Sequence, residues 1–269
     1  MIVMKVGFET MNQYLPKTIR VVGIIAVLLG ETEVLTSEAV AVPRENQTEK
    51  EANLKGQALG GLFNRWTFDD QKPQEVPTKF SVSSVGGGAE AVWAIQPDPL
   101  APSAPNILRA EPTCSAAPCY RLLVADKFQY EYPDISVRMR FPAEGGGGQG
   151  GLVFGYQDEK NFYAAVVDVA SMKLQVIRVL DGNTTVLQEK AIVPKKVDWH
   201  FFRVLRNTII SKDIIETFFD GALVHSIQDQ SFGLGRVGII ALGNSPLQFD
   251  NLFAIPLFSQ RPLSSPAAY

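Results

Sequence analysis

Residues 150–169, GGLVFGYQDEKNFYAAVVDV, contain two runs of alternating apolar residues around a short polar break, QDEK. In the first run, Leu152, Phe154 and Tyr156 fall on one face, which is the period-2 pattern of a half-buried strand. The matching face of the second run consists of Tyr163, Ala165, Val167 and Val169. A break of four polar residues predicts a hairpin. Because residues 162–167 are apolar on both faces, the second strand is predicted to be central and covered on both sides.

Short strand patterns of the same kind continue on both sides of this hairpin. The segments with a strand pattern are residues 64–69, 80–85, 91–95, 106–109, 120–124, 134–141, 173–180, 184–192, 199–206, 213–219, 222–228, 235–242 and 248–254. Asp181-Gly182 and Asp220-Gly221 separate apolar runs, and Asp-Gly in that position is a strong hairpin signal. We see no helical periodicity over eleven residues. The sequence therefore predicts an all-β fold, a jelly roll or sandwich of two antiparallel sheets.

The N-terminal segment indicates export. Lys17 and Arg20 precede a ten-residue apolar run, residues 21–30, which is shorter than the roughly twenty residues of a transmembrane helix. Ala39-Val40-Ala41 then matches the small-residue pattern of a cleavage site. We expect residues 1–41 to be a signal peptide or, if uncleaved, an N-terminal membrane anchor, and the protein to be periplasmic or extracellular.

The rest of the chain is predicted to form one domain with a polar segment on each side. Residues 42–59 have few apolar anchors and are predicted to be a flexible spacer. The sandwich is expected over residues 60–256, followed by a tail at 257–269. A net charge of −3 argues against a nucleic-acid partner, because phosphate binding needs a basic surface. Membrane contact is expected only through the N-terminal segment.

Cys114 and Cys119 are the two cysteines of the chain, in the sequence CSAAPC. Their spacing fits neither a zinc ribbon nor a CxxC redox motif, so we expect no metal and no cofactor. In an exported protein the natural interpretation is a disulfide that closes a small loop, and two free thiols are the alternative.

Several segments together resemble a known superfamily. They are GGLVFGYQDEKNFYAAVVD, VLDGNTTVLQE, VDWHFFRV, FFDGALVHSIQD and FGLGRVGIIALGNSPLQFDNLFA. This pattern resembles the concanavalin A-like (laminin-G-like) jelly rolls, and within them the bacterial 3-keto-disaccharide hydrolase and family-16-like glucanase domains. The resemblance covers about residues 60–256 and implies a sugar-related function. Many such relatives carry an arginine where this chain has Gly155, so that implied sugar contact is missing.

The residues do not carry the carboxylate pattern of a family-16-type glucanase. Such an enzyme needs acidic residues at i, i+2 and i+4 or i+5 on one strand, so that two carboxyl groups lie about 5–5.5 Å apart. Asp134 is followed on its face by Ser136 and Arg138, and Asp213 and Glu216 are three apart and face opposite ways. A pair assembled from separate strands stays open, and the catalytic residues remain unknown.

The two histidines, His200 and His225, are interpreted as exposed strand positions, with a general base or metal ligand as the alternative. Asp250, in the sequence FDN, is expected to accept hydrogen bonds from backbone amides near the end of the last strand.

A candidate ligand site follows from the strand at residues 134–141. With Ile135 and Val137 in the core, Arg138 and Arg140 must face outward, because a one-residue slip would bury both charges. The alternative is that they only solubilise the sheet or pair with acidic residues such as Glu189. Two guanidinium groups suit carboxylate- or hydroxyl-rich ligands. Trp93 and Tyr163 are the candidate aromatic platforms beside them.

Three functions remain. The first is an exported domain that binds a glycan or a cell-envelope carbohydrate without catalysis of its own. The second is a glycoside-cleaving enzyme of the 3-keto-disaccharide hydrolase type. The third is a structural or adhesive domain that binds protein.

Overall fold

A computed structural model describes residues 63–142, 147–209 and 212–257, all within one compact unit of the chain, Glu45–Tyr269. These residues form fifteen strands, and no helix occurs among them. The strands are β1 (Asn64–Trp66), β2 (Phe80–Gly86), β3 (Val92–Pro97), β4 (Asn106–Glu111), β5 (Cys119–Ala125), β6 (Pro133–Arg140), β7 (Gln149–Asp158), β8 (Asn161–Asp168), β9 (Lys173–Leu180), β10 (Asn183–Ala191), β11 (His200–Ile209), β12 (Lys212–Phe219), β13 (Ala222–Gln228), β14 (Arg236–Leu242) and β15 (Leu247–Pro256).

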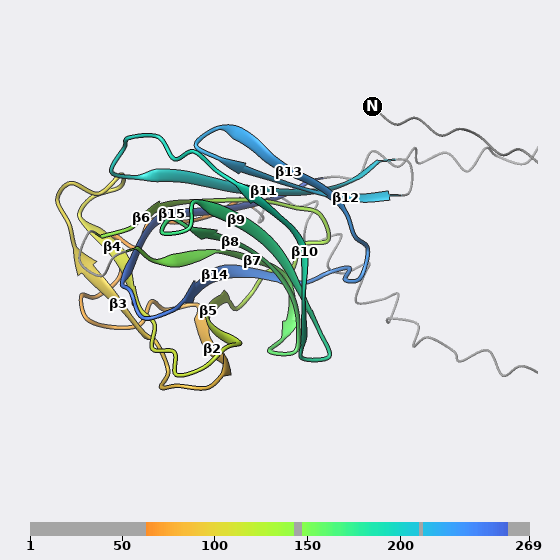
Figure 1. The fold of residues 1–269 in the computed structure, drawn as a ribbon. Helices are drawn as coiled ribbons and strands as arrows, with labels where there is room; N and C mark the ends of the chain where they lie inside the picture. Colours follow the sequence, from red (N-terminus) through yellow and green to blue (C-terminus); the bar gives the residue numbers. More distant parts are fainter. Residues whose placement is uncertain (1–62, 143–146, 210–211, 258–269) are drawn as a thin grey trace, which may run out of the picture. The chain divides into compact units, whose positions relative to one another are not determined.

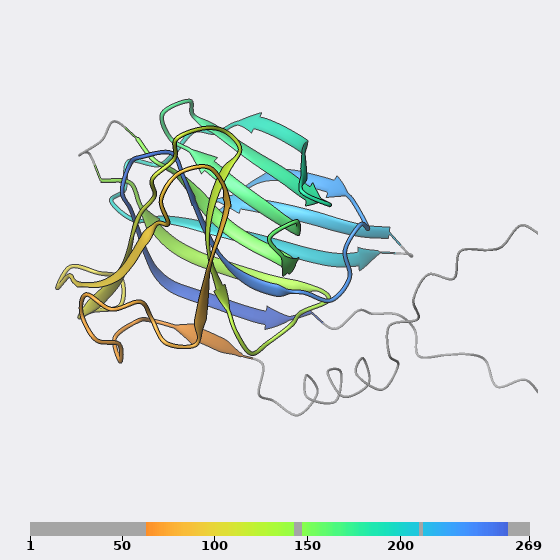
Figure 2. The same ribbon diagram turned by 90° about the horizontal axis from the view of Figure 1, so that it is seen from below.

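The strands form two antiparallel sheets packed face to face, as Figures 1 and 2 show. Sheet A has eight strands in the order β13-β12-β11-β6-β15-β4-β3, and β1 also pairs with β15. Sheet B has seven strands in the order β10-β9-β8-β7-β14-β5-β2. This is the all-β sandwich that the sequence predicts.

The main core fills the space between the sheets, and β6 illustrates how the sequence sets its direction. Ile135, Val137 and Met139 have no exposed surface and belong to this core, whereas Arg138 between them is exposed. The register predicted for this strand is therefore confirmed. The alternative register would have buried two arginines in an apolar layer.

The β7–β8 hairpin forms where it was predicted, but one side chain faces the other way. Leu152 and Phe154 point into the main core, whereas Tyr156 lies on the outer face of sheet B. The register shifts between Phe154 and Asp158, and Gly155 adopts a left-handed backbone with φ of 58°. A bulge of this kind reverses the alternation of side chains, which the simple period-2 pattern misses. The prediction that Tyr156 shares a face with Leu152 is wrong.

A second apolar layer covers the outer face of sheet B. It includes Phe162, Ala164 and Val166 of β8, each of them buried. The same strand sends its other face into the main core. The prediction that residues 162–167 form a central strand covered on both sides is therefore confirmed.

The turns follow the Asp-Gly signals. Asp181 and Gly182 join β9 to β10 with φ of 51° and 79°, and Asp220 and Gly221 join β12 to β13 with φ of 51° and 85°. Two consecutive left-handed residues are the conformation that tight hairpins require, and Asp-Gly adopts it readily.

The irregular segment before β5 is held by covalent and polar contacts. Cys114 and Cys119 form the predicted disulfide, with 5.8 Å between their Cα atoms. Arg121 is completely buried and donates hydrogen bonds to five backbone carbonyls. Its acceptors are the carbonyl groups of Val85, Gly87, Ala89, Thr113 and Tyr120. The guanidinium group thus joins the loop after β2, residues 85–89, to the segment before β5 through hydrogen bonds to their backbone carbonyls.

The signal segment 1–41, the spacer 42–59 and all but the first residue of the tail 257–269 lie outside the described residues. In the part of the chain that is described, no helix has the length and apolar character needed to cross a membrane.

Candidate functional site

A cavity lies beside β1, where the chain crosses from one sheet to the other. Strand β1 pairs with β15 in sheet A, whereas β2 pairs with β5 in sheet B. Residues 67–79 connect them and leave a cavity of about 410 Å³. Residues 63–68, 70–71, 77–80 and 125–128 line it, and we call it the Trp66 pocket. Its volume lies within the range of roughly 300–1,000 Å³ that is usual for small-molecule sites.

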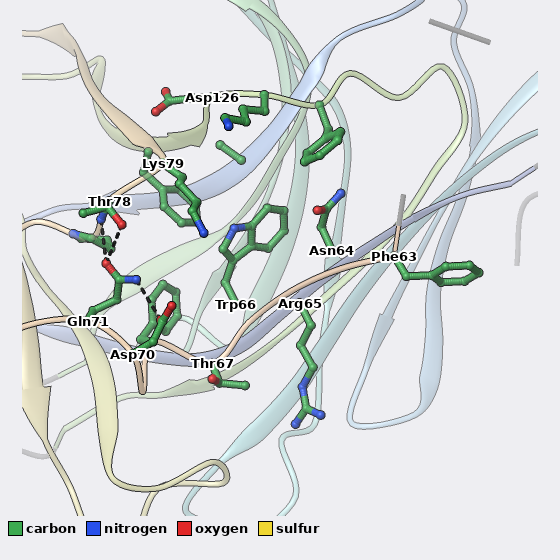
Figure 3. Close-up of a pocket in the computed structure, with 16 residues that line it drawn as sticks. Phe63, Asn64, Arg65, Trp66, Thr67, Asp70, Gln71, Thr78, Lys79 and Asp126 are labelled. Atoms are coloured by element: carbon green, nitrogen blue, oxygen red, sulfur yellow. Dashed lines mark hydrogen bonds between the residues drawn. The ribbon is translucent and has the colours of Figure 1, made fainter. Parts of the chain in front are cut away.

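Aromatic rings form much of the pocket wall. Figure 3 shows the indole of Trp66 in the pocket, between Asn64 and Lys79. Trp66 is partly buried and meets the ring of Phe80 edge to face, with 5.5 Å between the ring centroids. Phe80 in turn packs on the buried Phe68. The indole is thus held in place by the main core.

Polar groups surround the indole. The side-chain amide of Asn64 donates to the hydroxyl of Tyr130 at 2.6 Å, which fixes the orientation of the amide. Burial raises the pKa of Tyr130 to about 12, against the effect of that hydrogen bond, so its hydroxyl stays neutral. On the other side, Gln71 accepts hydrogen bonds from the backbone amide and the hydroxyl of Thr78 at 2.8 and 3.0 Å. These contacts hold the polar groups of the pocket in place.

Charged side chains of both signs line the pocket. Asp126 accepts a hydrogen bond from the hydroxyl of Ser81, and Asp70 accepts one from the amide of Gln71 at 2.8 Å. Lys79 and Lys127 are exposed, and neither forms an ion pair within the described part of the chain. The pocket therefore offers aromatic faces, hydrogen-bonding groups and two ammonium groups.

The arginines predicted to form a site lie elsewhere, on the outer face of sheet A. The guanidinium of Arg138 lies over the ring of Phe201, with 4.8 Å to its centroid, and that of Arg140 lies over Trp199 at 4.5 Å. Arg140 also pairs with Asp98, and with Asp198 at 3.0 Å. The suggested partner Glu189 instead contacts Lys173 at 2.6 Å.

The two aromatic platforms predicted beside these arginines are core residues. Trp93 is 1% exposed and Tyr163 is completely buried, and both belong to the cluster between the sheets. Tyr163 stacks on Phe154 with 5.2 Å between the centroids, and its hydroxyl donates to Asp229. Their ring faces are covered by neighbouring side chains, so neither can stack on a ligand at the surface.

Both histidines are buried, which corrects the prediction of exposed positions. His200 contacts Asp220 at 2.8 Å between Nδ1 and Oδ2 and stacks on Phe219. His225 is completely buried, with Nδ1 at 2.9 Å from the hydroxyl of Thr217. Burial, together with a smaller effect of nearby Lys190, lowers the pKa of His225 to about 4. His225 is therefore neutral at pH 7.

Asp250 has the structural role that the sequence predicts. Its carboxylate accepts hydrogen bonds from the backbone amides of Ser103 and Asn251, both at 2.6 Å. The hydroxyl of Ser103 donates to Asp69 at 2.8 Å, which links the two carboxylates to one loop. Burial raises the pKa of Asp250 to about 6, against the two amide hydrogen bonds. Asp250 has no exposed surface, so it does not face a ligand.

The outer face of sheet B is closed by side chains that meet across it. The hydroxyls of Tyr120 on β5 and Thr184 on β10 lie 3.0 Å apart, although four strands separate β5 from β10. Such an approach requires the sheet to curve so that this face is concave. A cavity of about 130 Å³ remains at one end, with Gln149 and Asp168 among its lining. It is smaller than usual ligand sites.

Among the described residues, no group of three or more His, Cys, Asp or Glu side chains is placed so that it could hold a metal ion. The structure brings together none of the carboxylates into the same-strand pattern of a retaining glucanase.

The two antiparallel sheets define a jelly-roll sandwich, and solved structures share it. The carbohydrate-binding module CBM66 from Bacillus subtilis has a TM-score of 0.51 and 16% identity, over 66% of this chain and 96% of that chain. The Bacillus licheniformis beta-glucanase has a TM-score of 0.47 and 14% identity, over 73% of this chain and 99% of that chain. The cellulose-induced protein Cip1 has a TM-score of 0.49 and 14% identity, over 72% of this chain and 98% of that chain.

This chain therefore has the concanavalin A-like fold that its sequence resembles. At this level of identity the likeness concerns the fold. No protein-family model and no curated protein matches the chain.

The Trp66 pocket is not predicted by the sequence pattern. Trp66 lies in the strand pattern predicted over residues 64–69, and the residue packs against the core. The pocket arises from the crossing of residues 67–79 between sheets and from the loop at 126–128, which is distant in sequence. The one local signal was the sequence FNRW, residues 63–66, in which two aromatic residues flank an amide and a cation.

Proposed function

We propose that this chain is an exported carbohydrate-binding domain without catalysis of its own, and that it holds a sugar in the Trp66 pocket. The observation that carries the proposal is the indole of Trp66 in a cavity of about 410 Å³ with polar groups on both sides. Sugars present C–H groups on one face and hydroxyls around the edge. An aromatic platform beside fixed hydrogen-bonding groups matches both features.

The surroundings of the pocket favour a small ligand over a protein partner. Protein interfaces are broad surfaces of about 800 Å² on each partner, whereas this site is a cavity lined by residues of two loops and one short strand. The fold supports the same proposal, because a carbohydrate-binding module is among its structural neighbours.

Binding rather than cleavage is proposed because the two carboxylates in the pocket are in contact with solvent. Asp70 and Asp126 are both exposed. The general acid of a glycoside hydrolase needs a raised pKa, which burial in an apolar site usually provides. The hydrolase of the 3-keto-disaccharide type therefore remains the second candidate, and the two exposed carboxylates of the pocket do not favour it.

Export is supported by the disulfide between Cys114 and Cys119, since such bonds persist in oxidising compartments. A periplasmic or extracellular domain would meet glycans of the cell envelope or its surroundings. The signal segment at residues 1–41, cleaved or retained as an anchor, is part of this proposal.

The outward arginines are the alternative location for the same function. Arg138 has an exposed guanidinium above Phe201, which leaves its fork open to an acidic ligand. Arg140 is less suited, because its donors already meet Asp98, Asp198 and the amide of Gln248. The pocket is favoured because it can surround a sugar, whereas Arg138 can contact only one edge.

A glycan array followed by calorimetric titration of the best ligand tests the proposal. We expect Trp66→Ala to weaken binding at least about tenfold, since it removes the aromatic platform. Trp66→Phe, which preserves the contact with Phe80, should fold normally and bind with intermediate affinity. Trp199→Ala is the matched control, because it removes the same residue type from the outer face of sheet A.

Two outcomes would contradict the proposal. If no glycan binds the wild-type protein, carbohydrate binding is wrong. If Trp199→Ala or Arg138→Ala weakens binding while Trp66→Phe does not, the ligand lies on the outer face of sheet A. Thermal unfolding of each variant separates a loss of contact from a loss of fold.

A further inference from the structure

Lys79 has a backbone conformation that side chains seldom adopt. Its φ is 70°, in the left-handed region, which is unfavourable for a residue with a Cβ atom. Its backbone carbonyl accepts a hydrogen bond from the amide of Asp126 at 3.0 Å, so the conformation is fixed by the loop opposite. The preceding residue, Thr78, is held by Gln71. A glycine would fit here without strain, yet the position carries a long cationic side chain.

This fixed backbone places the side chain of Lys79 in the wall of the Trp66 pocket, beside the indole (Figure 3). Lys127 contributes a second ammonium group from the loop after β5. Neither lysine pairs with a carboxylate among the residues described. The carboxylates of the same pocket, Asp70 and Asp126, are instead engaged by the neutral donors Gln71 and Ser81.

Arg65 is the remaining charged side chain of the pocket lining. Arg65 donates to the side-chain oxygen of Asn251 at 2.9 and 2.6 Å, and it points away from the indole in Figure 3. Among the described residues, none of the three cations Arg65, Lys79 and Lys127 has a carboxylate partner, although the chain as a whole has a net charge of −3. The lining thus carries three positive and two negative side chains, and this single excess positive charge beside an aromatic face matches a ligand with one anionic substituent.

We propose that the sugar held in the Trp66 pocket carries an acidic group, a carboxylate or a sulfate, and that Lys79 selects for it. The inference rests on the proposed function, since it names the class of ligand for the same pocket. The strained backbone of Lys79 then has a reason: it directs the ammonium group toward the ligand.

The test uses sugars that differ only in the acidic group. Suitable probes are D-glucuronic acid with D-glucose, D-galacturonic acid with D-galactose, and N-acetylglucosamine 6-sulfate with N-acetylglucosamine. We expect the acidic member of at least one pair to bind about tenfold or more tightly, as a charge-assisted hydrogen bond provides. That preference should weaken as salt is added.

Variants of Lys79 separate charge from strain. Lys79→Gln keeps the strained backbone and removes the charge, so it should bind both members of a pair equally. Lys79→Arg should retain the preference. Lys79→Gly should lose the preference and also raise the unfolding temperature by about 2–4 °C, because it relieves the left-handed strain.

Gln74 provides the matched control in the same loop. It has φ of 66° and does not line the pocket. Gln74→Gly should therefore raise the unfolding temperature as Lys79→Gly does and leave the sugar preference unchanged. Equal affinity of the wild-type protein for both members of every pair overturns the acidic-ligand inference and leaves the proposed function standing. A preference that survives Lys79→Gln also overturns it. Failure to bind any carbohydrate overturns both proposals.

Discussion

Both sheets carry aromatic rings on their outer faces, and the two faces cover these rings in different ways. On sheet B, Phe162 is completely buried, between Tyr120 at 6.0 Å and Tyr156 at 6.1 Å from its ring centroid. That face works as a second core. On sheet A, the rings are partly exposed, and guanidinium groups cover them: Arg138 lies over Phe201 and Arg203 over Phe218.

The comparison explains where a ligand can bind. Side chains cover most of the concave face of sheet B and leave a cavity of only about 130 Å³, which is smaller than usual ligand sites. The outer face of sheet A is occupied by ion pairs, such as the two contacts at 2.6 and 2.5 Å between Arg203 and Asp134. What stays open is the cavity between the sheets beside β1. In this molecule the location of the proposed binding site is set by where the chain crosses from one sheet to the other.

The comparison predicts a large difference between two phenylalanines. Phe162→Ala should lower the free energy of unfolding by about 3–5 kcal/mol, the usual range for a buried phenylalanine. Phe201→Ala, on the outer face of sheet A, should lower it by only about 1–2 kcal/mol, because its ring is partly exposed and loses mainly the contact with Arg138. Urea unfolding of both variants measures the difference.

Equal losses for these two variants would contradict the view that only sheet B carries a second core. A small loss for Phe162→Ala in particular would mean that the concave face opens in solution.

The pH dependence tests the outer face of sheet A, which buries a carboxylate. The pKa of Asp250 is about 6, raised from 3.8 chiefly by burial, so the folded protein binds this proton more tightly than the unfolded chain does. Between pH 4 and pH 6 the folded state holds more protons, and stability must therefore fall as pH rises. A shift of 6 − 3.8, about two units at roughly 1.36 kcal/mol each, gives a loss on the order of 3 kcal/mol.

Asp250→Asn isolates this contribution, because an amide does not titrate there. We expect the stability difference between wild type and Asp250→Asn to shift against the wild type by about 3 kcal/mol from pH 4 to pH 7. His225, with its pKa lowered to about 4, acts in the opposite direction in both proteins and cancels in the difference. A difference that does not change with pH would show that Asp250 is ionised throughout.

The sequence predicts the fold well because its alternation patterns are long and its turns are chemically distinctive. Asp181-Gly182 and Asp220-Gly221 mark hairpins that the structure contains. The outward direction of Arg138 follows from the apolar residues on either side of it. The pattern fails at Tyr156, because the bulge at Gly155 depends on a backbone conformation that any alternation rule ignores.

The site was harder to predict for a physical reason. The alternation pattern of a strand does not show whether an aromatic ring is buried, as for Trp93, or lines a pocket, as for Trp66. The difference comes from contacts between segments distant in sequence, such as Lys79 with Asp126. His225 shows the same limit, because its burial depends on pairing with Thr217.

The smallest predicted effect concerns the contact that spans the concave face of sheet B. Tyr120→Phe keeps the ring that packs on Phe162 and removes only the hydroxyl that meets Thr184. We expect the free energy of unfolding to fall by about 0.5–1.5 kcal/mol, because Thr184 is exposed and can bond to water instead.

If the contact holds β10 against the other side of the face, amide hydrogen exchange in β10 should accelerate more than in the central strand β8. Tyr156→Phe is the matched control, since its hydroxyl donates to Ser83 at 3.2 Å and makes no contact with β10. Unchanged exchange in β10 of Tyr120→Phe would show that apolar packing alone keeps the concave face closed, which would sharpen the view of this face as a second core.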